Sequence, residues 1–483
     1  MANIQAKATK PPKEKIDRGI LKVALILVFG AIASQLDSTM VNVAINTLAT
    51  NLHSTVSAIQ WVITGYVLTM GLAVPISGWA IGRFGGRNVY MFSLWVFLIS
   101  SLLCSLAWNT GSLIGFRLIQ GIGAGLLIPT MQNVLVQSAG GRSLGRLISI
   151  ISIPALLGPI LGPVIGGLIM DNLSWRWIFY VNIPIMMVAL WLTWRHIPRD
   201  ESSQNKPRLD VIGFLLLSPS FAVLIYGISK ISSQGQLISA GVLVPLAAGL
   251  LLLAAYIVYA LRSSRPPLLD LHLFRSRHFL ASNVTLFLSG MVMNGVLLLL
   301  PLYYEQVRGE SVLMTGLLLI PQGVGMLITR SWIGGLADRV GPRSIVLFSL
   351  AVTFVASIPF AFAGADTNHF LLGAAQLVRG AALNGILIPI MVSAYKGLRK
   401  EQIPHASIST RIFQTIGGAF GSAVLATVIG QQLKGGAGAS LSSLSHAYQT
   451  AFWWSVGFAA VSFFPAMFLS GRESGNGDAQ TKQ

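Results

Sequence analysis

One acidic side chain lies well inside the long apolar segments of this chain. Asp37 belongs to the sequence LDSTMVNVAI in the first apolar segment, and the other acidic residues lie at segment ends or between segments. A charge in the hydrocarbon core of a bilayer costs roughly 2.5–3.5 kcal/mol or more, so a carboxyl group there indicates a function. We predict that Asp37 binds and releases a proton. The alternative is a polar residue at the outer interface of the membrane.

A basic residue lies at a similar depth in the fourth apolar segment. An arginine in hydrocarbon needs a partner, so we predict an ion pair or a water-bridged contact between Arg117, in FRLIQGIGAG, and Asp37. Gln120 follows Arg117 at i,i+3 spacing and therefore shares its helix face. The alternative is that the long Arg117 side chain extends to the outer surface.

Other charged residues near or inside the apolar segments leave alternatives open. Glu305 lies with Arg308 and Glu310 at an outer segment end, where the spacing fits both a solvated ion pair and a second proton site. Arg379 and Arg411 lie deep in later segments. The sequence does not decide whether they bind backbone carbonyls or an anionic part of a substrate.

Two glycine- and arginine-rich turns repeat along the chain. GWAIGRFGGR begins at Gly78 and GGLADRVGPR at Gly334, an offset of 256 residues (334 − 78), and LLIPTM at Leu126 is echoed by ILIPIM at Ile386. Because glycine permits tight turns between helices, the recurrence favours a gate hinge over a simple topology determinant. The motif SIPALLGPILGPVIGG, from Ser152, contains prolines that kink a helix. We predict gating roles for Gly78, Arg83, Gly85, Arg87, Gly158, Pro159, Gly162, Pro163, Asp338 and Arg339.

A membrane-spanning scaffold must position these residues. The chain has 483 residues, of which 53% are apolar and 10% charged, whereas soluble domains average about 25% charged residues. A helical span needs about 20 apolar residues. We predict an all-α membrane protein with fourteen transmembrane helices, at roughly 20–46, 57–80, 88–108, 111–137, 143–170, 176–195, 210–229, 237–261, 277–305, 311–332, 343–365, 369–395, 402–433 and 448–469.

The distribution of basic residues predicts the orientation. When the N-terminus is placed in the cytoplasm, most Lys and Arg residues outside the spans fall on the cytoplasmic side. This alternation indicates an even number of spans and cytoplasmic termini in a bacterial inner membrane. It also explains the net charge of +18 as a cytoplasmic collar, so no nucleic-acid partner is expected.

The long repeat predicts the domain organisation. Two six-helix bundles follow from the paired motifs, with two additional helices between them, and paired halves of this kind are common in secondary transporters. We predict a cytoplasmic tail at 1–19, an N-terminal bundle at 20–196, a linker with two spans at 197–262, a C-terminal bundle at 263–470 and a cytoplasmic tail at 471–483.

Aromatic and polar residues recur in the segments that are expected to line a central cavity. A wall of aromatic and methionine side chains adapts to many ligands, although each such residue alone is more often part of helix packing. The candidates for substrate binding are Asn42, Trp61, Tyr66, Gln120, Asn133, Asn294, Tyr303, Gln322, Asn384 and Gln414.

Several classes of function find no support in the sequence. Cys104 is the single cysteine, so an intrachain disulfide and a cysteine metal cluster are excluded. No GxxxxGK[ST] loop is present, which argues against ATP as the direct energy source. We expect no cofactor, no metal and no enzymatic activity. The expected partners of the monomer are small-molecule substrates, protons and the lipid bilayer.

Together these motifs resemble the major facilitator superfamily, and within it the fourteen-helix drug:proton antiporters. The resemblance covers nearly the whole chain. Gly78–Arg87 and Gly334–Arg343 look like the two copies of the family's loop signature, and Phe116–Gly125 looks like its span-four signature. GPILGPVIGG (Gly158–Gly167) looks like the antiporter signature of span five, and Leu36–Ile45 and Trp175–Ile185 look like signatures of the fourteen-helix branch.

The resemblance implies a fold and a function. Two six-helix bundles with two extra central helices would export hydrophobic, often cationic compounds against a proton gradient by alternating access. The alternatives are a dedicated exporter of one metabolite or lipid-like compound, a proton symporter, and a sensor or channel. Gly82 stands where the family's first loop usually carries an acidic residue, whereas the second copy keeps Asp338. The charge network that this acid supports in the family is therefore expected to be changed here.

Overall fold

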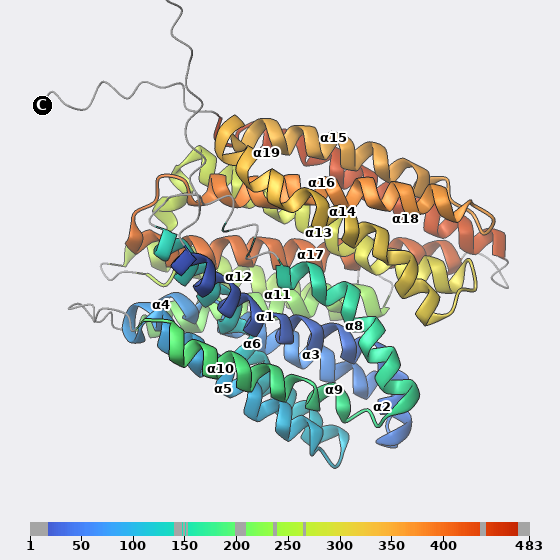
Figure 1. The fold of residues 1–483 in the computed structure, drawn as a ribbon, viewed down its shortest axis with the longest axis horizontal. Coiled ribbons are helices and arrows are strands. Elements are labelled where there is room, and N and C mark those ends of the chain that lie inside the picture. The colour runs from blue at the N-terminus through green and yellow to red at the C-terminus, as the bar shows by residue number, and fades with distance from the viewer. Residues whose placement is uncertain are drawn as a thin grey trace, which may run out of the picture.

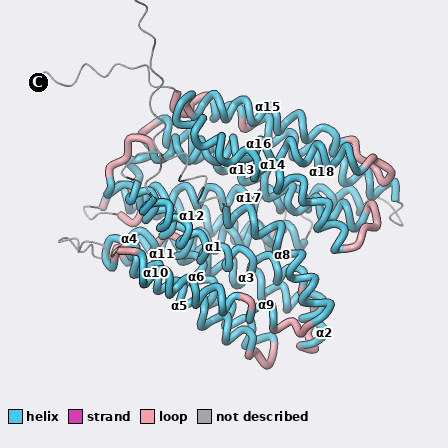
Figure 2. Tube along the Cα trace, viewed as in Figure 1, coloured by secondary structure: helices cyan, strands magenta, loops and turns pink. Residues whose placement is uncertain are grey.

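The structure is a computed structural model of the chain, and all regular secondary structure in the described residues is helical (Figures 1 and 2). Long apolar sequences favour helices in a bilayer because every backbone hydrogen bond is then satisfied within the segment. The described residues are 18–139, 147, 150, 153–198, 209–234, 239–263, 267–434 and 441–471.

The helices form two bundles that lie one above the other in Figure 1, with a helical hairpin between them in the chain. The first bundle contains α1 (Arg18–Val43), α2 (Ile45–Asn51), α3 (Val56–Ala73), α4 (Ile76–Phe84), α5 (Gly86–Ser105), α6 (Thr110–Ala139), α8 (Ile153–Asn172), α9 (Trp177–Tyr180) and α10 (Asn182–His196). The hairpin is α11 (Val211–Gln234) and α12 (Ala240–Arg262). The second bundle contains α13 (Arg277–Gln306), α14 (Val312–Val340), α15 (Pro342–Ala361), α16 (His369–Tyr395), α17 (Ile403–Lys434), α18 (Leu441–Val461) and α19 (Phe463–Ala466), with short 3₁₀ helices at Leu271–Arg275 and Lys400–Gln402.

Fewer helices meet the length and composition required to cross a membrane than the fourteen that the sequence predicts. Ten of the described helical segments are long and apolar enough to cross a membrane, and the bent pair α3–α4 adds an eleventh. The structure therefore supports a multi-helical membrane fold, and the number fourteen remains a prediction.

Several predicted spans begin, end or break at unexpected places. The span predicted at 57–80 bends by 54° between α3 and α4, next to Pro75, because proline cannot donate the hydrogen bond that continues a helix. The span predicted at 20–46 ends at Val43 and is followed by α2, and the one predicted at 448–469 corresponds to α18, which begins at Leu441.

The bundles meet at the end of the molecule that carries the α4–α5 and α14–α15 turns, which we call the basic end because Arg83, Arg195, Arg262 and Arg339 lie there. A methyl group added at Gly78 would lie 2.8 Å from Ile408 Cδ1 and 3.4 Å from Pro404 Cβ, so α4 and α17 are in direct contact. One apolar cluster includes residues of both bundles. The bundles also approach each other away from this end, where a methyl group added at Gly316 of α14 would lie 3.3 Å from Val164 Cγ2 of α8.

The hairpin α11–α12 packs at the junction of the bundles. On the side of the first bundle, Trp61 of α3 stacks on Tyr226 of α11, with ring centroids 5.9 Å apart. On the side of the second bundle, the Thr427 hydroxyl of α17 donates to the Ile231 carbonyl at 3.5 Å. The hairpin therefore contacts both halves through α11.

Candidate functional site

Glycines of α8 bring that helix against the turn of α1 that carries Asp37. A methyl group at Gly158 would lie 2.8 Å from Gln35 Cβ, and one at Gly162 would overlap the Thr39 side chain. The Thr39 hydroxyl donates to the Gly158 carbonyl at 2.9 Å. Small residues at such contacts let membrane helices approach closely. The Gly- and Pro-rich motif thus positions the α1 segment on both sides of Asp37.

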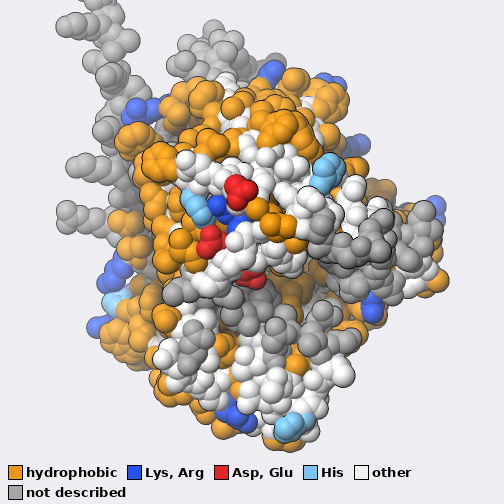
Figure 3. Space-filling view, turned by 90° about the vertical axis from the view of Figure 1, so that its right-hand side faces the viewer, with side chains coloured by type: hydrophobic (Ala, Val, Ile, Leu, Met, Phe, Trp, Pro, Cys, Tyr) orange, Lys and Arg blue, Asp and Glu red, His pale blue; other side chains and the backbone are white. Residues whose placement is uncertain are grey.

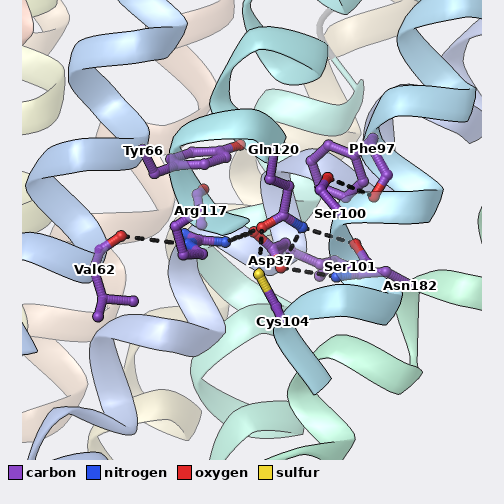
Figure 4. Close-up of polar contacts among 12 residues, drawn as sticks. Asp37, Val62, Tyr66, Phe97, Ser100, Ser101, Cys104, Arg117, Gln120 and Asn182 are labelled. Atoms are coloured by element: carbon purple, nitrogen blue, oxygen red, sulfur yellow. Dashed lines mark hydrogen bonds and ion pairs between the residues drawn. The ribbon is translucent and has the colours of Figure 1, made fainter. Parts of the chain in front are cut away.

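The predicted contact between Asp37 and Arg117 is present as a direct ion pair between α1 and α6 (Figure 4). Arg117 Nη1 donates to Asp37 Oδ2. Asp37 Oδ1 accepts from Asn182 Nδ2 at 2.8 Å and from Gln120 Nε2 at 3.3 Å. The exposed fractions of Asp37 and Arg117 are 0% and 1%, so bulk water does not reach the pair. Arg117 therefore does not extend to the surface.

The remaining face of the Arg117 guanidinium is also occupied. Its Nη1 donates to Gln120 Oε1 at 2.6 Å, and its Nε donates to the Val62 carbonyl of α3 at 3.3 Å. Its Cζ lies 4.1 Å from the centroid of the Tyr66 ring, which is a cation–π contact. Figure 4 shows the ring stacked beside the guanidinium. Arg117 thus keeps partners on α3 that do not depend on the charge of Asp37.

This asymmetry defines what the site can do. A buried ion pair balances a large desolvation penalty against a strong attraction, and loss of one charge leaves the other uncompensated. Proton binding to Asp37 would remove the attraction to Arg117 while Val62 and Tyr66 still hold the guanidinium toward α3. A change of one proton would therefore alter the force between α1 and α6.

Sequence reasoning missed part of this site. Asn182 begins α10 and donates directly to Asp37, and Ser101 of α5 accepts from Gln120 Nε2 at 2.7 Å. Asn182 lies inside the motif Trp175–Ile185, which could have drawn attention to it. Gln120, a predicted substrate-binding residue, belongs to the hydrogen-bond network of the ion pair, and its role toward substrate stays a prediction.

The charged residues at the opposite end are arranged differently from the predicted pairing. Arg308 donates to the Thr367 carbonyl at 2.6 Å and to His369 Nε2 at 2.8 Å, and Glu310 lies 3.5 Å from the same nitrogen. Among the described residues no ion pair involves Glu305, which is half-buried. Charged and histidine side chains gather on the end of the molecule seen in Figure 3. The predicted i,i+3 pairing of Glu305 with Arg308 is therefore wrong, and its proton role stays a prediction.

The repeated turns share a backbone conformation. Gly85 and Gly341, which are 256 residues apart (341 − 85), have φ values of 84° and 95°, a region that favours glycine. Arg87 donates to the Trp194 carbonyl at 2.7 Å, whereas Arg83 and Arg339 are exposed. The side chains of Pro159, Pro163, Asp338 and Asn42 lie outside the described residues.

The predicted substrate-binding residues separate into several environments. Tyr303 lies in an apolar cluster of the second bundle and donates to the Gly364 carbonyl at 2.7 Å, so it serves packing there. Asn384 joins α16 to α14 by donating to the Met326 carbonyl. Trp61 contacts α11, and Tyr66 contacts Arg117.

Four other candidates make no side-chain hydrogen bond to another helix among the described residues. Asn133 is 1% exposed and neither its Nδ2 nor its Oδ1 has a partner there. Gln322 Oε1 likewise has no hydrogen-bond partner among the described residues. Asn294 donates only to the Gly290 carbonyl one turn earlier, at 3.3 Å. Gln414 is half-buried on α17, where its backbone carbonyl faces Gly290. These four remain candidates.

The described helices form two bundles, and the first of them encloses the buried ion pair. In the part of the chain that the structure describes, no group of three or more His, Cys, Asp or Glu side chains could hold a metal ion. The family model described as Major Facilitator Superfamily matches residues 27–422. The chain belongs to this superfamily and is a multi-pass membrane transporter.

Individual relatives share most of their length with the chain. It is 34% identical over 423 residues to a multidrug resistance protein B homolog of Mycobacterium tuberculosis. This match covers 87% of this chain and 78% of that protein. It is 29% identical over 418 residues to the multidrug export protein EmrB of Escherichia coli, covering 86% and 81%. The crystal structure of the human organic anion transporter MFSD10 has the same fold, with a TM-score of 0.63 at 18% identity over 95% of this chain and 100% of that one.

Proposed function

We propose that this protein exports hydrophobic, often cationic compounds in exchange for protons by alternating access. The relatives named as multidrug resistance or multidrug export proteins support the direction and breadth of transport. The proposal includes fourteen spans in a bacterial inner membrane, a monomeric protein, and the basic end on the cytoplasmic side, as the positive-inside rule favours.

The observation that carries the proposal is the fully buried pair of Asp37 and Arg117 between two helices of one bundle. A driving ion can shift a conformational equilibrium only when it binds the two states with different affinity. In the described conformation the carboxylate accepts from three donors and has no contact with bulk water, so a proton can bind it only when these contacts change. A state in which α1 and α6 separate would remove the Arg117 donor and open the carboxylate to a proton.

The contact between the bundles fits one of the two states of this cycle. α4 and α17 touch at the basic end through Gly78, Ile408 and Pro404. With the basic end in the cytoplasm, this conformation closes the pathway on the cytoplasmic side. Proton entry from outside would then load Asp37 before the bundles rock toward the opposite state.

The test is proton-driven uptake of a hydrophobic cation, such as ethidium, by everted membrane vesicles under an imposed pH gradient. We expect Asp37→Asn to abolish uptake while the protein is present in the membrane at normal amount. Glu310→Gln, which removes an acidic charge from the opposite end, is the matched control and should retain uptake. Full uptake by Asp37→Asn would contradict the proposed mechanism.

A further inference from the structure

A pocket of about 380 Å³ opens at the basic end of the second bundle, away from the ion pair of the first. It lies between the start of α13, the end of α16 and the residues that follow α19. Its polar lining residues are Ser276, His278, Ser393, Lys396 and Ser470. Pockets of about 300–1,000 Å³ are typical of small-molecule sites, so this one can hold a compact polar group.

Hydroxyl groups line this pocket without acceptors for their protons. Ser470 is 5% exposed, and its Oγ has no hydrogen-bond partner among the described residues. Ser393 is 3% exposed, and its Oγ accepts from the Ser470 backbone N–H at 3.2 Å. A buried hydroxyl that lacks a partner is costly, so a ligand that accepts hydrogen bonds would stabilise the pocket.

The backbone around Ser470 holds this hydroxyl in a fixed place. The Ser470 carbonyl accepts from the Arg343 N–H at the start of α15 at 3.2 Å, while its own N–H donates to Ser393 of α16. On the other wall, His278 Nδ1 donates to the Phe468 carbonyl at 3.0 Å. The chain after α19 is therefore bonded to α13, α15 and α16, and the pocket between them is preformed.

The electrostatics of the pocket favour an anion. The first turn of α13 presents backbone N–H groups without helical partners, which is the positive end of the helix dipole. The end of α16 contributes a partial charge of opposite sign, about half an elementary charge, but Lys396 directly after it adds a full positive charge. None of the described residues that line the pocket is acidic. The combination of cation, helix start and hydroxyl donors matches the oxygens of a phosphate group.

Exposed aromatic rings adjoin the pocket on its apolar side. Phe464 and Phe468 are 71% and 51% exposed, and their ring centroids are 5.6 Å apart. The hydrogen bond from His278 to the Phe468 carbonyl brings this aromatic pair next to the pocket. Aromatic residues are enriched at the level of lipid headgroups, where they contact acyl chains. The phosphate is therefore expected to belong to an amphipathic molecule.

We propose that this pocket binds the phosphate group of an anionic phospholipid. Lys396 and the serine hydroxyls hold the phosphate oxygens, and Phe464 and Phe468 contact the acyl chains. The bound phosphate joins the start of α13 to the end of α16 and to the chain after α19, so it stabilises the basic end of the second bundle. The site lies outside the transport pathway of the proposed function. Only the assignment to the cytoplasmic leaflet depends on the proposed orientation.

The test is isothermal titration of the full-length protein in a neutral detergent with short-chain lipids. The probes are dihexanoyl-phosphatidylglycerol and dihexanoylglycerol, which share their acyl chains and differ in the phosphate-containing headgroup. We expect dihexanoylglycerol to bind at least about tenfold more weakly, because it makes no charge-assisted hydrogen bond. Inorganic phosphate is added as a competitor to distinguish a lipid from a free anion. Weak competition supports the phospholipid, whereas full displacement would leave the phosphate site in place and overturn the assignment to a lipid.

Variants connect the binding to this pocket. Lys396→Gln and Ser470→Ala should each weaken binding of the phosphatidylglycerol about threefold or more and change binding of dihexanoylglycerol less than about twofold. Arg195→Gln removes an exposed positive charge from the basic end of the first bundle and is the matched control with unchanged affinity. Equal affinity for the two lipids, or wild-type affinity in both pocket variants, would overturn the proposal. The assay involves neither a gradient nor an exported compound, so its outcome is independent of the Asp37→Asn transport assay.

Discussion

The two bundles each bury an arginine between equivalent helices, but among the described residues only the first bundle provides a counter-ion. In the first bundle, Arg117 of α6 meets Asp37 of α1 and is held on all sides. In the second, the one hydrogen bond of Arg379 on α16 within the described part of the chain goes to the Val292 carbonyl of α13. The same architecture therefore holds a closed charge pair in one half and an open positive charge in the other.

Helix packing beside these arginines is similar in the two halves. In the first bundle Gly158 and Gly162 bring α8 against α1. In the second, Gly417 and Gly421 of α17 meet the α13 backbone at Phe287 and Met291. The difference between the bundles thus lies in charge rather than in backbone geometry. In the proposed mechanism, proton binding therefore belongs to the first bundle, because the described residues of the second contain no comparable ion pair.

The largest expected difference between the two bundles is in the stability of variants that lose the buried arginine. Arg117→Met leaves the Asp37 carboxylate buried without its partner and should destabilise the protein by about 3–5 kcal/mol. Arg379→Met removes an unpaired charge and should leave stability unchanged or increase it. Thermal unfolding of both variants in detergent measures the difference. Equal destabilisation by the two substitutions would show that Arg379 is as well compensated as Arg117.

A smaller effect is expected from the helix contact that positions Asp37. Gly162→Ala places a methyl group against Thr39 and should destabilise the α1–α8 contact by about 1–3 kcal/mol, with reduced transport. Gly167→Ala, on the same helix, meets nothing within 4 Å and is the control. Transport rates per protein molecule provide the measurement. Similar rates for the two variants would mean that the close approach of α8 is dispensable.

The smallest of these effects concerns the hydrogen bond that the sequence did not reveal. Asn182→Ala removes one of three donors to the Asp37 carboxylate, and the donors from Arg117 and Gln120 remain. Because Asn182 contacts the carboxylate directly, its loss should change the pH profile of transport while activity is retained. A pH profile that coincides with that of the wild type would exclude Asn182 from proton coupling.

The sequence predicts the ion pair better than its surroundings. Charged residues are conspicuous in apolar segments, and equal depth in two spans restricts their partners. The contact between Asp37 and Arg117 can therefore be predicted from the sequence. Asn182 could not, because an amide near a helix end is compatible with many roles. The sequence predicts Tyr303 in the cavity, whereas it packs in an apolar cluster, because composition does not reveal which face of a helix turns toward the bundle core.

The sequence likewise predicts the overall organisation of the fold better than its local details. The repeated motifs predict two halves, and the positive φ of Gly85 and Gly341 shows that the repeat extends to the backbone. The bend between α3 and α4 was not anticipated, because proline is tolerated in membrane helices and its local effect depends on neighbouring helices. The contact of α4 with α17 likewise depends on the conformational state, which no local pattern encodes.

The central claim is that transport requires proton exchange at Asp37, and proton release on substrate binding tests it most directly. Purified protein in weakly buffered detergent solution is mixed with ethidium while a pH-sensitive dye reports free protons. The account predicts that the protonated wild-type protein releases protons on binding and that Asp37→Asn binds ethidium without release. Equal proton release by the wild type and by Asp37→Asn would contradict it.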